Sequence, residues 1–179
     1  MNITLIISGG IAAYKSLVLI RALKSSGHQV IPILTEGAQA FITPLSAAAL
    51  AESPAYTELF DLKSESEMGH IRLSRESDLL LVAPASADLI AKMALGLADD
   101  LASATLLASN KPVWIAPAMN PEMWRHPATQ SNVTRLRERG VRILGPDVGD
   151  TACGEVGSGR MLEPEPLRAA VDGFAQPGP

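Results

Sequence analysis

The sequence predicts an α/β fold: a Rossmann-like, mostly parallel sheet with helices on both faces, formed as a single domain. The chain has 179 residues, which suits one domain with a substantial core. Hydrophobic residues make up 47% of it and aromatic residues only 4%, so we expect an aliphatic core with helices packed closely on a sheet. Short apolar runs also alternate with segments of helical periodicity, a pattern typical of parallel strands joined by right-handed crossovers.

The first part of the chain is predicted to form a strand, a tight turn and a helix. Residues 2–8 are an apolar run that ends at a Gly-Gly pair, and residues 11–26 place Ile11, Val18 and Ala22 on neighbouring helical turns. This spacing predicts a helix, which Gly27 ends. The elements expected next are a strand over 30–34, a largely helical segment over 38–50 with a break at Pro44, and a weaker edge strand over 55–60.

The rest of the chain continues the alternation, with one exception. After a polar loop over 61–68, we expect helices over 69–76, 88–109 with a break near Gly96, 127–139 and 165–173, and strands over 78–83, 112–116 and 141–144. Residues 145–163 show no convincing periodicity, so we expect them to lack regular structure. Such long segments inside compact domains are usually functional or disordered, and Cys153 and Arg160 favour function here.

Composition limits the possible partners and location. The formal net charge is −4 and the basic residues are scattered, so we expect neither a nucleic acid nor a membrane as a partner. The most apolar stretch, 79–107, is interrupted by Pro84 and by charged residues, unlike a membrane span. A single cysteine and the absence of a leader before the first strand predict a cytoplasmic location. No cluster has metal-ligand spacing, so no metal site is expected.

Small residues follow three of the predicted strands. The turn at Ser8, Gly9 and Gly10 exposes backbone N–H groups at the start of a helix, where an anion such as phosphate binds well, although it is equally consistent with a simple tight corner. Thr35 and Ser86 follow two further strands, and they are also ordinary helix N-caps. Because all three turns lie at the carboxyl edge of a parallel sheet, they favour one phosphorylated cofactor, a mononucleotide rather than a dinucleotide.

Three other side chains are candidates for chemistry, and each also has an ordinary structural interpretation. His70 begins a short helix after a polar loop, although a lone histidine is more often structural or solvated. Asn120 lies between two prolines, where it is either a turn residue or a hydrogen-bonding group for a carboxylate or amide. Cys153, the only cysteine, lies in a glycine-rich segment, which favours a movable cover carrying a thiol over a small buried hydrophobe.

Six short segments together resemble a known family. They are Gly-Gly-Ile-Ala-Ala-Tyr-Lys at 9–15, Met-Gly-His-Ile at 68–71, Pro-Ala-Ser-Ala-Asp-Leu at 84–89, Pro-Ala-Met-Asn-Pro-Glu-Met-Trp at 117–124, Ala-Cys-Gly-Glu at 152–155 and Gly-Arg-Met-Leu-Glu-Pro at 159–164. The chain resembles the cysteine decarboxylases that bind flavin mononucleotide (FMN). The nearest resemblance is to phosphopantothenoylcysteine decarboxylases, in particular the amino-terminal domain of bacterial bifunctional coenzyme A biosynthesis flavoproteins.

The resemblance spans residues 3 to about 170 and implies roles for particular residues. His70 matches the active-site histidine, Asn120 the residue that binds the substrate carboxylate, and Cys153 the proton donor on a substrate clamp. The residues that match FMN contacts are Ser8, Gly9, Gly10, Thr35, Ser86, Ala87, Asp88, Leu89 and Met119. Those that match substrate contacts are Asn120, Met123, Ala152, Cys153, Gly154 and Arg160. We expect a domain over 1–173 and a tail or linker over 174–179.

The implied reaction converts (R)-4′-phospho-N-pantothenoylcysteine to 4′-phosphopantetheine in coenzyme A biosynthesis. Direct loss of CO2 from cysteine would leave a carbanion with no electron sink, whereas hydride transfer from the β-carbon to flavin gives a thioaldehyde that accepts those electrons. Decarboxylation then gives an enethiol, which takes the hydride back while Cys153 supplies a proton. We expect His70 to assist the oxidation by removing a proton or stabilising a thiolate.

The resemblance also implies an oligomeric state, and it leaves alternative functions open. It implies a homotrimer, or a higher assembly of trimers, with a synthetase domain fused in longer chains. A decarboxylase of carboxy-terminal peptide cysteines would share His70 and Asn120, whereas a flavin prenyltransferase would share mainly the phosphate turns. A flavin-binding regulatory subunit without turnover is a third alternative, which the complete set of His70, Asn120 and Cys153 disfavours.

Overall fold

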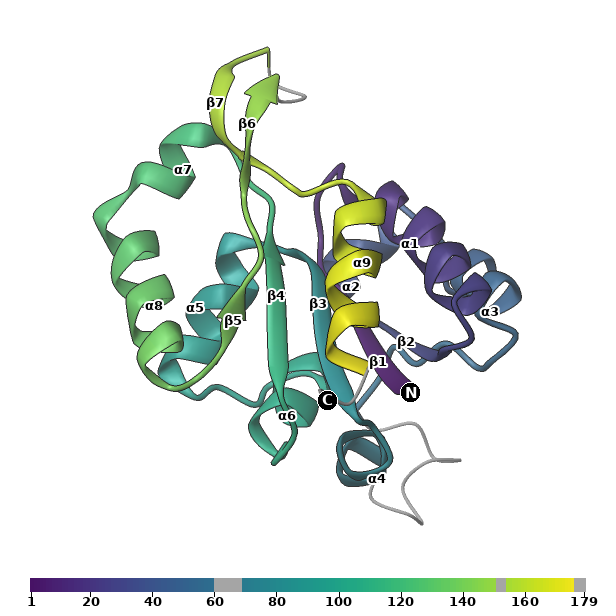
Figure 1. Ribbon diagram of the computed structural model, residues 1–179. Helices are drawn as coiled ribbons and strands as arrows, with labels where there is room; N and C mark the ends of the chain where they lie inside the picture. Colours follow the sequence, from purple (N-terminus) through teal and green to yellow (C-terminus); the bar gives the residue numbers. More distant parts are fainter. Residues whose placement is uncertain (60–68, 151–153, 176–179) are drawn as a thin grey trace.

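The computed structural model describes residues 1–59, 69–150 and 154–175, and Figure 1 shows a central sheet with helices on both sides. The sheet has five strands in the order β2-β1-β3-β4-β5, and every neighbouring pair is parallel. The strands are β1 (Asn2–Ile7), β2 (Gln29–Leu34), β3 (Leu79–Ala85), β4 (Val113–Pro117) and β5 (Arg142–Ile143). The predicted α/β class and parallel sheet are confirmed. The strand order reverses next to β1, which is where parallel sheets of this kind bind ligands.

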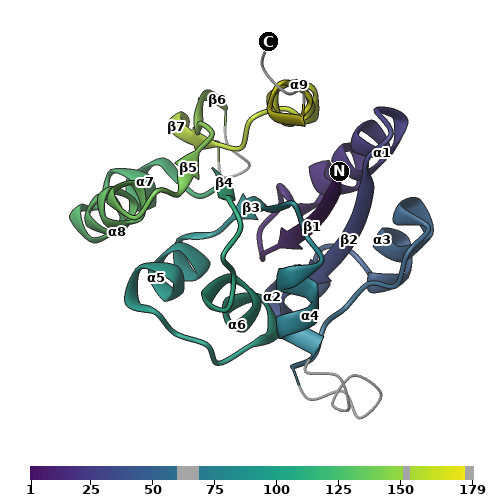
Figure 2. The same ribbon diagram turned by 60° about the horizontal axis from the view of Figure 1, so that its bottom comes forward.

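Two layers of helices cover the sheet. The helices are α1 (Ala13–Ser25), α2 (Glu36–Gln39), α3 (Pro44–Ala51), α4 (Gly69–Arg75), α5 (Ala87–Leu95), α6 (Leu101–Leu107), α7 (Pro121–Arg125), α8 (Pro127–Glu138) and α9 (Pro164–Ala175). Helices α1, α3 and α9 lie on one face, and α4, α5, α6 and α8 lie on the other (Figures 1 and 2). None of the helices in the described ranges is long and apolar enough to cross a bilayer.

The strands are apolar on both faces because both faces are covered. In β3, Leu79, Leu81 and Ala83 pack with the α1, α3 and α9 layer, whereas Leu80 and Val82 pack with the opposite layer. All five side chains are 0% exposed. Alternate residues therefore enter different cores, and a strand buried twice has the continuous apolar run seen in the sequence.

The predicted breaks between helices are confirmed. Pro44 occupies the first turn of α3, and the Thr43 hydroxyl caps that helix by accepting a hydrogen bond from the Ser46 N–H. Gly96 follows α5 in the left-handed conformation, with φ of 73°, which ends the helix at low cost because glycine has no side chain.

The first helix is confirmed, but the apolar residues whose spacing indicated it do not form its buried face. Ile11 and Val18 are 57% and 53% exposed, and Ala22 is only half-buried. The helix is rotated so that Leu19 and Leu23 enter the core instead. The chain offers two apolar stripes at helical spacing on α1, and contact with the sheet selects the one with the larger leucine side chains.

The prediction that residues 145–163 lack regular structure is also wrong. They contain an antiparallel pair, β6 (Asp147–Asp150) and β7 (Val156–Arg160), which projects beyond the carboxyl edge of the sheet in Figure 1. Glycines at 149, 157 and 159 interrupt the alternation that would have indicated strands. We call β6, β7 and Gly154–Glu155 the hairpin.

Smaller differences lie at the edges of the predicted elements. Helix α7 was not predicted, and the expected strand over 55–60 is reduced to one bridge between Ile33 and Tyr56 in the described part. Helix α9 continues to Ala175, two residues beyond its expected end. The polar loop expected over 61–68 lies outside the described residues.

Candidate functional site

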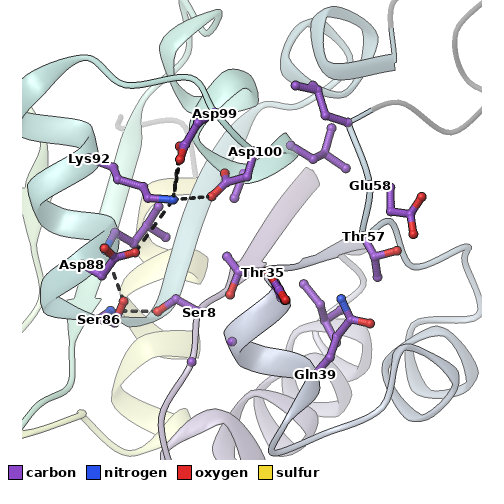
Figure 3. A pocket seen from close by; sticks show the side chains of 18 residues that line it. Ser8, Thr35, Gln39, Thr57, Glu58, Ser86, Asp88, Lys92, Asp99 and Asp100 are labelled. Atoms are coloured by element: carbon purple, nitrogen blue, oxygen red, sulfur yellow. Dashed lines mark hydrogen bonds and ion pairs between the residues drawn. The ribbon is translucent and has the colours of Figure 1, made fainter.

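A cavity of about 910 Å³ opens at the carboxyl ends of the strands β1, β2 and β3 (Figure 3). Six of the predicted cofactor residues line it: Ser8, Gly9, Thr35, Ser86, Asp88 and Leu89. The other lining residues are Leu34, Glu36, Gly37, Gln39, Thr57, Glu58, Leu59, Lys92, Asp99, Asp100, Leu101 and Ala102. Turns far apart in the sequence therefore converge on one cavity beside the point where the strand order reverses.

Ser8 fixes the ends of two strands rather than presenting a free hydroxyl. Its Oγ donates to the Pro84 carbonyl at 2.7 Å and accepts the Ser86 N–H at 2.8 Å, and its backbone N–H also donates to Pro84. Because Ser8 is only 1% exposed, these bonds hold β1 and the end of β3 in register at the cavity wall. Its contribution to a ligand is therefore mainly to place Gly9 and Ser86.

Thr35 and Ser86 are helix N-caps whose hydroxyls also face the cavity (Figure 3). The Thr35 oxygen accepts the Ala38 N–H, and the Ser86 oxygen accepts the Leu89 N–H, both at 3.2 Å. A capping hydroxyl uses a lone pair and keeps its O–H hydrogen for another acceptor. The interpretation as helix N-caps and the interpretation as ligand contacts are thus compatible, since each hydroxyl can cap its helix and also donate to a ligand.

Glycine is required where the first two turns meet. A Cβ built on Gly9 would lie 3.0 Å from the backbone carbon of Gly37, tighter than nine in ten real Cβ contacts, so one of the two backbones would have to shift. Gly10 has φ of 143°, which disfavours other residues. Ala12 at the N-cap of α1 has no capping oxygen, and the first turn holds no acidic residue. The positive end of α1 is therefore left for an anion.

The far wall of the cavity holds an ionic cluster that sequence reasoning missed. The Lys92 ammonium lies 2.9 Å from Asp100, 3.1 Å from Asp99 and 3.9 Å from Asp88 (Figure 3). These carboxylates, led by the Asp100 hydrogen bond, outweigh burial and raise the Lys92 pKa above its ordinary value. One signal was available: Asp100 and Ser103 have the spacing of a capping box, which begins α6 at this wall.

The charges of this cluster are held in place by hydrogen bonds. Burial alone would raise the Asp100 pKa, but the Ser103 N–H, the Lys92 ammonium and the Ser103 hydroxyl together lower it. Lysine and aspartate are therefore both charged at neutral pH. A lysine surrounded by three carboxylates offers little net attraction to a phosphate, which leaves the glycine turn as the anion-binding end of the cavity.

Asn120 is oriented by the helix that it begins. Its Oδ1 accepts the N–H groups of Glu122 at 2.7 Å and Met123 at 3.3 Å, which caps α7. The side chain therefore points its Nδ2 toward the hairpin, where it donates to the Glu155 carboxylate at 2.7 Å. The geometry suits the predicted role, because the amide already holds a carboxylate.

The hairpin is pressed against the segment that carries Asn120. The Met119 N–H donates to the Gly159 carbonyl at 2.9 Å, and a Cβ on Gly159 would lie only 2.3 Å from the Met119 carbonyl oxygen. A Cβ on Gly157 would meet the Pro121 ring at 3.0 Å. Glycine in β7 therefore allows the strand to approach the predicted substrate residues.

The other described residues predicted to contact substrate differ in exposure and in their partners. Met123 is 49% exposed on α7, and Gly154 is exposed two residues before β7. The Arg160 guanidinium lies over Gly149 across the hairpin and is paired with Glu163. Hydrogen bonds from Lys15 first and from Arg160 second lower the Glu163 pKa below its usual range.

Among the described residues, His70 and Asn120 belong to helices at opposite ends of the sheet. Helix α4, which begins at Gly69 and carries His70, lies beside the amino ends of the strands, whereas α7 begins at their carboxyl ends (Figure 1). His70 is not among the residues that line the cavity. Cys153 and Ala152 lie outside the described residues. Gly10 and Ala87 adjoin lining residues in sequence without lining the cavity themselves, and Met119 is not among the lining residues either.

Fold and site together define a class: an α/β protein with a nucleotide-sized cavity at the strand switch point and a hairpin packed against the Met119–Asn120 segment. The flavoprotein family model matches residues 1–176. The chain therefore belongs to the flavoprotein family, which confirms the resemblance inferred from the sequence.

Individual relatives agree with this assignment. The coenzyme A biosynthesis bifunctional protein CoaBC of Vibrio vulnificus strain YJ016 is 50% identical over 178 residues, covering 99% of this chain and 44% of that protein. A solved PPC decarboxylase, a cysteine-to-serine mutant complexed with pantothenoylaminoethenethiol, is 32% identical with a TM-score of 0.88, covering 97% of both chains. The FMN-dependent cysteine decarboxylase SpaF is 28% identical with a TM-score of 0.80, covering 98% of both chains. The chain thus spans less than half of its CoaBC relative.

Proposed function

We propose that the chain is an FMN-dependent decarboxylase that converts (R)-4′-phospho-N-pantothenoylcysteine to 4′-phosphopantetheine in coenzyme A biosynthesis. The observation that carries this proposal is the Asn120 amide, which is held by α7 so that its Nδ2 donates to the Glu155 carboxylate of the hairpin. The 50% identity with a coenzyme A biosynthesis protein and the likeness to a PPC decarboxylase complexed with pantothenoylaminoethenethiol support this substrate over others.

The cavity fits FMN in size and in chemistry. Its volume of about 910 Å³ lies within the range of cofactor pockets. The turn at Gly9, where a Cβ would collide with Gly37, lets backbone N–H groups approach a phosphate closely. Thr35 and Ser86 would donate their hydroxyl hydrogens to the cofactor, and Leu89 supplies an apolar wall.

When bound, the flavin supplies a reversible two-electron sink for the substrate. The chain's residues bind, orient and transfer protons. Asn120 holds the substrate carboxylate until it leaves as CO2, and its capped Oδ1 prevents the amide from rotating away. Cys153 donates the proton that completes the product, and Arg160 and Met123 flank the substrate. His70 removes a proton or stabilises the thiolate during substrate oxidation.

We propose a homotrimer, or an assembly of trimers, as the active form. One chain places α4 and α7 at opposite ends of the sheet, so His70 would serve the Asn120 site of a neighbouring copy. An exposed apolar stripe on and before α1 supports association: Ile11, Tyr14 and Val18 are 57%, 54% and 53% exposed.

Three further parts of the proposal concern the context of the chain. The flavin-binding domain covers 1–173, with 174–179 as a tail or linker. A synthetase domain is fused in a longer chain, which is supported by the 44% coverage of the bifunctional relative. The location is the cytoplasm, which is supported by the metabolic role in the relatives' name.

The Cys153→Ser variant tests the proposed function. Purified wild type and variant, both loaded with FMN, are incubated with phosphopantothenoylcysteine, and products are identified by mass spectrometry. We expect 4′-phosphopantetheine from the wild type and a decarboxylated enethiol, two hydrogens short of that product, from the variant. A wild type that binds FMN but converts only peptides with carboxy-terminal cysteine would replace this function with the peptide alternative.

A further inference from the structure

Lys15 is the most buried lysine whose contacts are described, and the proposed reaction gives it no role. It ends the Gly-Gly-Ile-Ala-Ala-Tyr-Lys segment, and its side chain is 8% exposed. Burying an ammonium is costly unless it is paired and hydrogen-bonded. The partners of Lys15 are therefore a guide to what the side chain does.

Both partners of Lys15 lie just beyond the hairpin. Its Nζ donates to the Met161 carbonyl at 3.2 Å and to the Glu163 carboxylate at 2.8 Å. The same Glu163 oxygen also pairs with Arg160. Lys15 thus joins the start of α1, next to the glycine turn, to a segment far away in the sequence. Its two partners follow it by 146 and 148 residues.

This segment is continuous with the strand that contacts the substrate residues. Met161 is 1% exposed, so its main chain is anchored in the core two residues after Gly159. Gly159 in turn accepts the Met119 N–H, next to Asn120. Lys15 is therefore bonded to the segment that directly follows β7, and Met119 is bonded to β7 itself.

We infer that Lys15 is a positioning residue for substrate binding: it holds the end of β7, Arg160 and Glu163 in the arrangement that the Asn120 site requires. This inference rests on the proposed function. Without the ammonium, the Met161 carbonyl loses the Lys15 donor and Glu163 keeps only its pair with Arg160, so the segment after β7 is held less firmly. Substrate binding must then supply the ordering that Lys15 provides in advance, which weakens binding more than it slows chemistry.

A second lysine on α1 provides a matched control. Lys24 Nζ donates to the Ala51 carbonyl at 2.9 Å and to the Glu52 carboxylate at 2.6 Å, the same pair of acceptor types, but at the other end of the helix. Lys15→Met and Glu163→Gln are compared with Lys24→Met and Glu52→Gln in the FMN-loaded chain of 179 residues. The measurements are KM and kcat for phosphopantothenoylcysteine, FMN affinity, and amide hydrogen exchange over 156–163.

We expect Lys15→Met and Glu163→Gln to raise KM about tenfold, with kcat changed less than about threefold and FMN affinity unchanged. Exchange over 156–163 should accelerate in these two variants and not in the controls. Equal KM values and equal exchange in all four variants would overturn the inference. Should Lys15→Met fail to fold, the isosteric Glu163→Gln decides by the same criteria.

Failure of the proposed function would be distinguishable from failure of this inference. If the wild type does not decarboxylate the substrate, the proposed function fails. Hydrogen exchange then still tests the link between α1 and the hairpin, since faster exchange confined to Lys15→Met and Glu163→Gln supports it and unchanged exchange overturns it.

Discussion

The Nδ2 atom of Asn120 lies 2.7 Å from a carboxylate oxygen of Glu155, so the residue proposed to bind the substrate carboxylate already binds one from its own chain. The other half of the amide is committed to α7, because Oδ1 accepts two backbone N–H groups. The amide thus presents donor hydrogens in one fixed direction. A substrate carboxylate that enters this position takes over a geometry that the chain has built.

Asn120→Asp should therefore abolish most of the activity while preserving the helix cap. The carboxylate can still accept the N–H groups of α7, but it cannot donate and it repels the substrate carboxylate. We expect kcat/KM to fall by about 100-fold or more, since a hydrogen bond to a charged group contributes about 1.5–3 kcal/mol before repulsion is added. The assay is CO2 release, with thermal unfolding measured in parallel.

Asn110→Asp adds the same charge at an exposed position and serves as its control. That variant should retain wild-type kcat/KM. Similar kcat/KM values in the two variants would contradict the role given to Asn120.

Gly9→Ala should weaken FMN binding. The added methyl group would lie 3.0 Å from the Gly37 backbone, so one of the two turns must move and the phosphate end of the cavity changes shape. We expect the dissociation constant for FMN to rise about tenfold or more, which corresponds to about 1.4 kcal/mol. Fluorescence quenching of free FMN on titration measures it.

Gly173→Ala is the matched control, because a Cβ there meets nothing within 4 Å in α9. It should leave FMN affinity unchanged and stabilise the helix by about 0.5–1 kcal/mol. Wild-type affinity in Gly9→Ala would show that the two turns do not shape the cofactor site.

Lys92→Met should make the cavity wall repel FMN. Asp88, Asp99 and Asp100 keep their negative charges when the ammonium that neutralises them is removed. We expect weaker FMN binding at low salt and a smaller defect at high salt, because salt screens the repulsion of the phosphate. The double variant Lys92→Met/Asp100→Asn should recover part of the affinity. A defect that is independent of salt in the single variant would argue for a packing role instead.

A hydrogen bond between His28 and Asp172 of α9 makes the stability of the fold depend on pH. The His28 ring, through Nε2, bonds the Asp172 carboxylate at 2.8 Å, and this hydrogen bond is the main cause of an Asp172 pKa below its usual value. A carboxyl group with a lowered pKa stabilises the fold above its unfolded pKa of about 4, and that contribution is lost as pH falls through the lower folded value.

Asp172→Asn should therefore lower Tm at pH 7 and have a smaller effect at about pH 3, where the wild-type carboxyl group is also becoming neutral. Thermal unfolding followed by circular dichroism at both pH values measures the difference. A larger loss of Tm at acid pH than at neutral pH would reverse the sign and contradict this assignment.

The sheet was predictable because strands buried on two faces are continuously apolar, as in Leu79 to Ala83. The convergence of Ser8, Thr35 and Ser86 followed from the rule that parallel strands share a carboxyl edge. The buried face of α1 was not predictable, since the sequence contains two apolar stripes and only packing chooses between them.

Other features depend on contacts that local patterns do not encode. The hairpin was missed because its glycines serve close approach to Met119 and Pro121 and so carry no alternation. Lys92 meets Asp99 and Asp100 across the turn between two helices, and Lys15 meets Glu163 across the whole chain. Ion pairs of this kind follow from topology, which must be known first.

The central claim is that a flavin bound at the switch point allows this chain to remove a carboxyl group beside Asn120. The most direct measurement titrates purified chain with FMN and quantifies CO2 released from phosphopantothenoylcysteine under anaerobic conditions. We predict stoichiometric FMN binding and one CO2 per substrate consumed, over many turnovers, with the flavin oxidised at the end. Failure to bind FMN, or binding without CO2 release, would contradict the account.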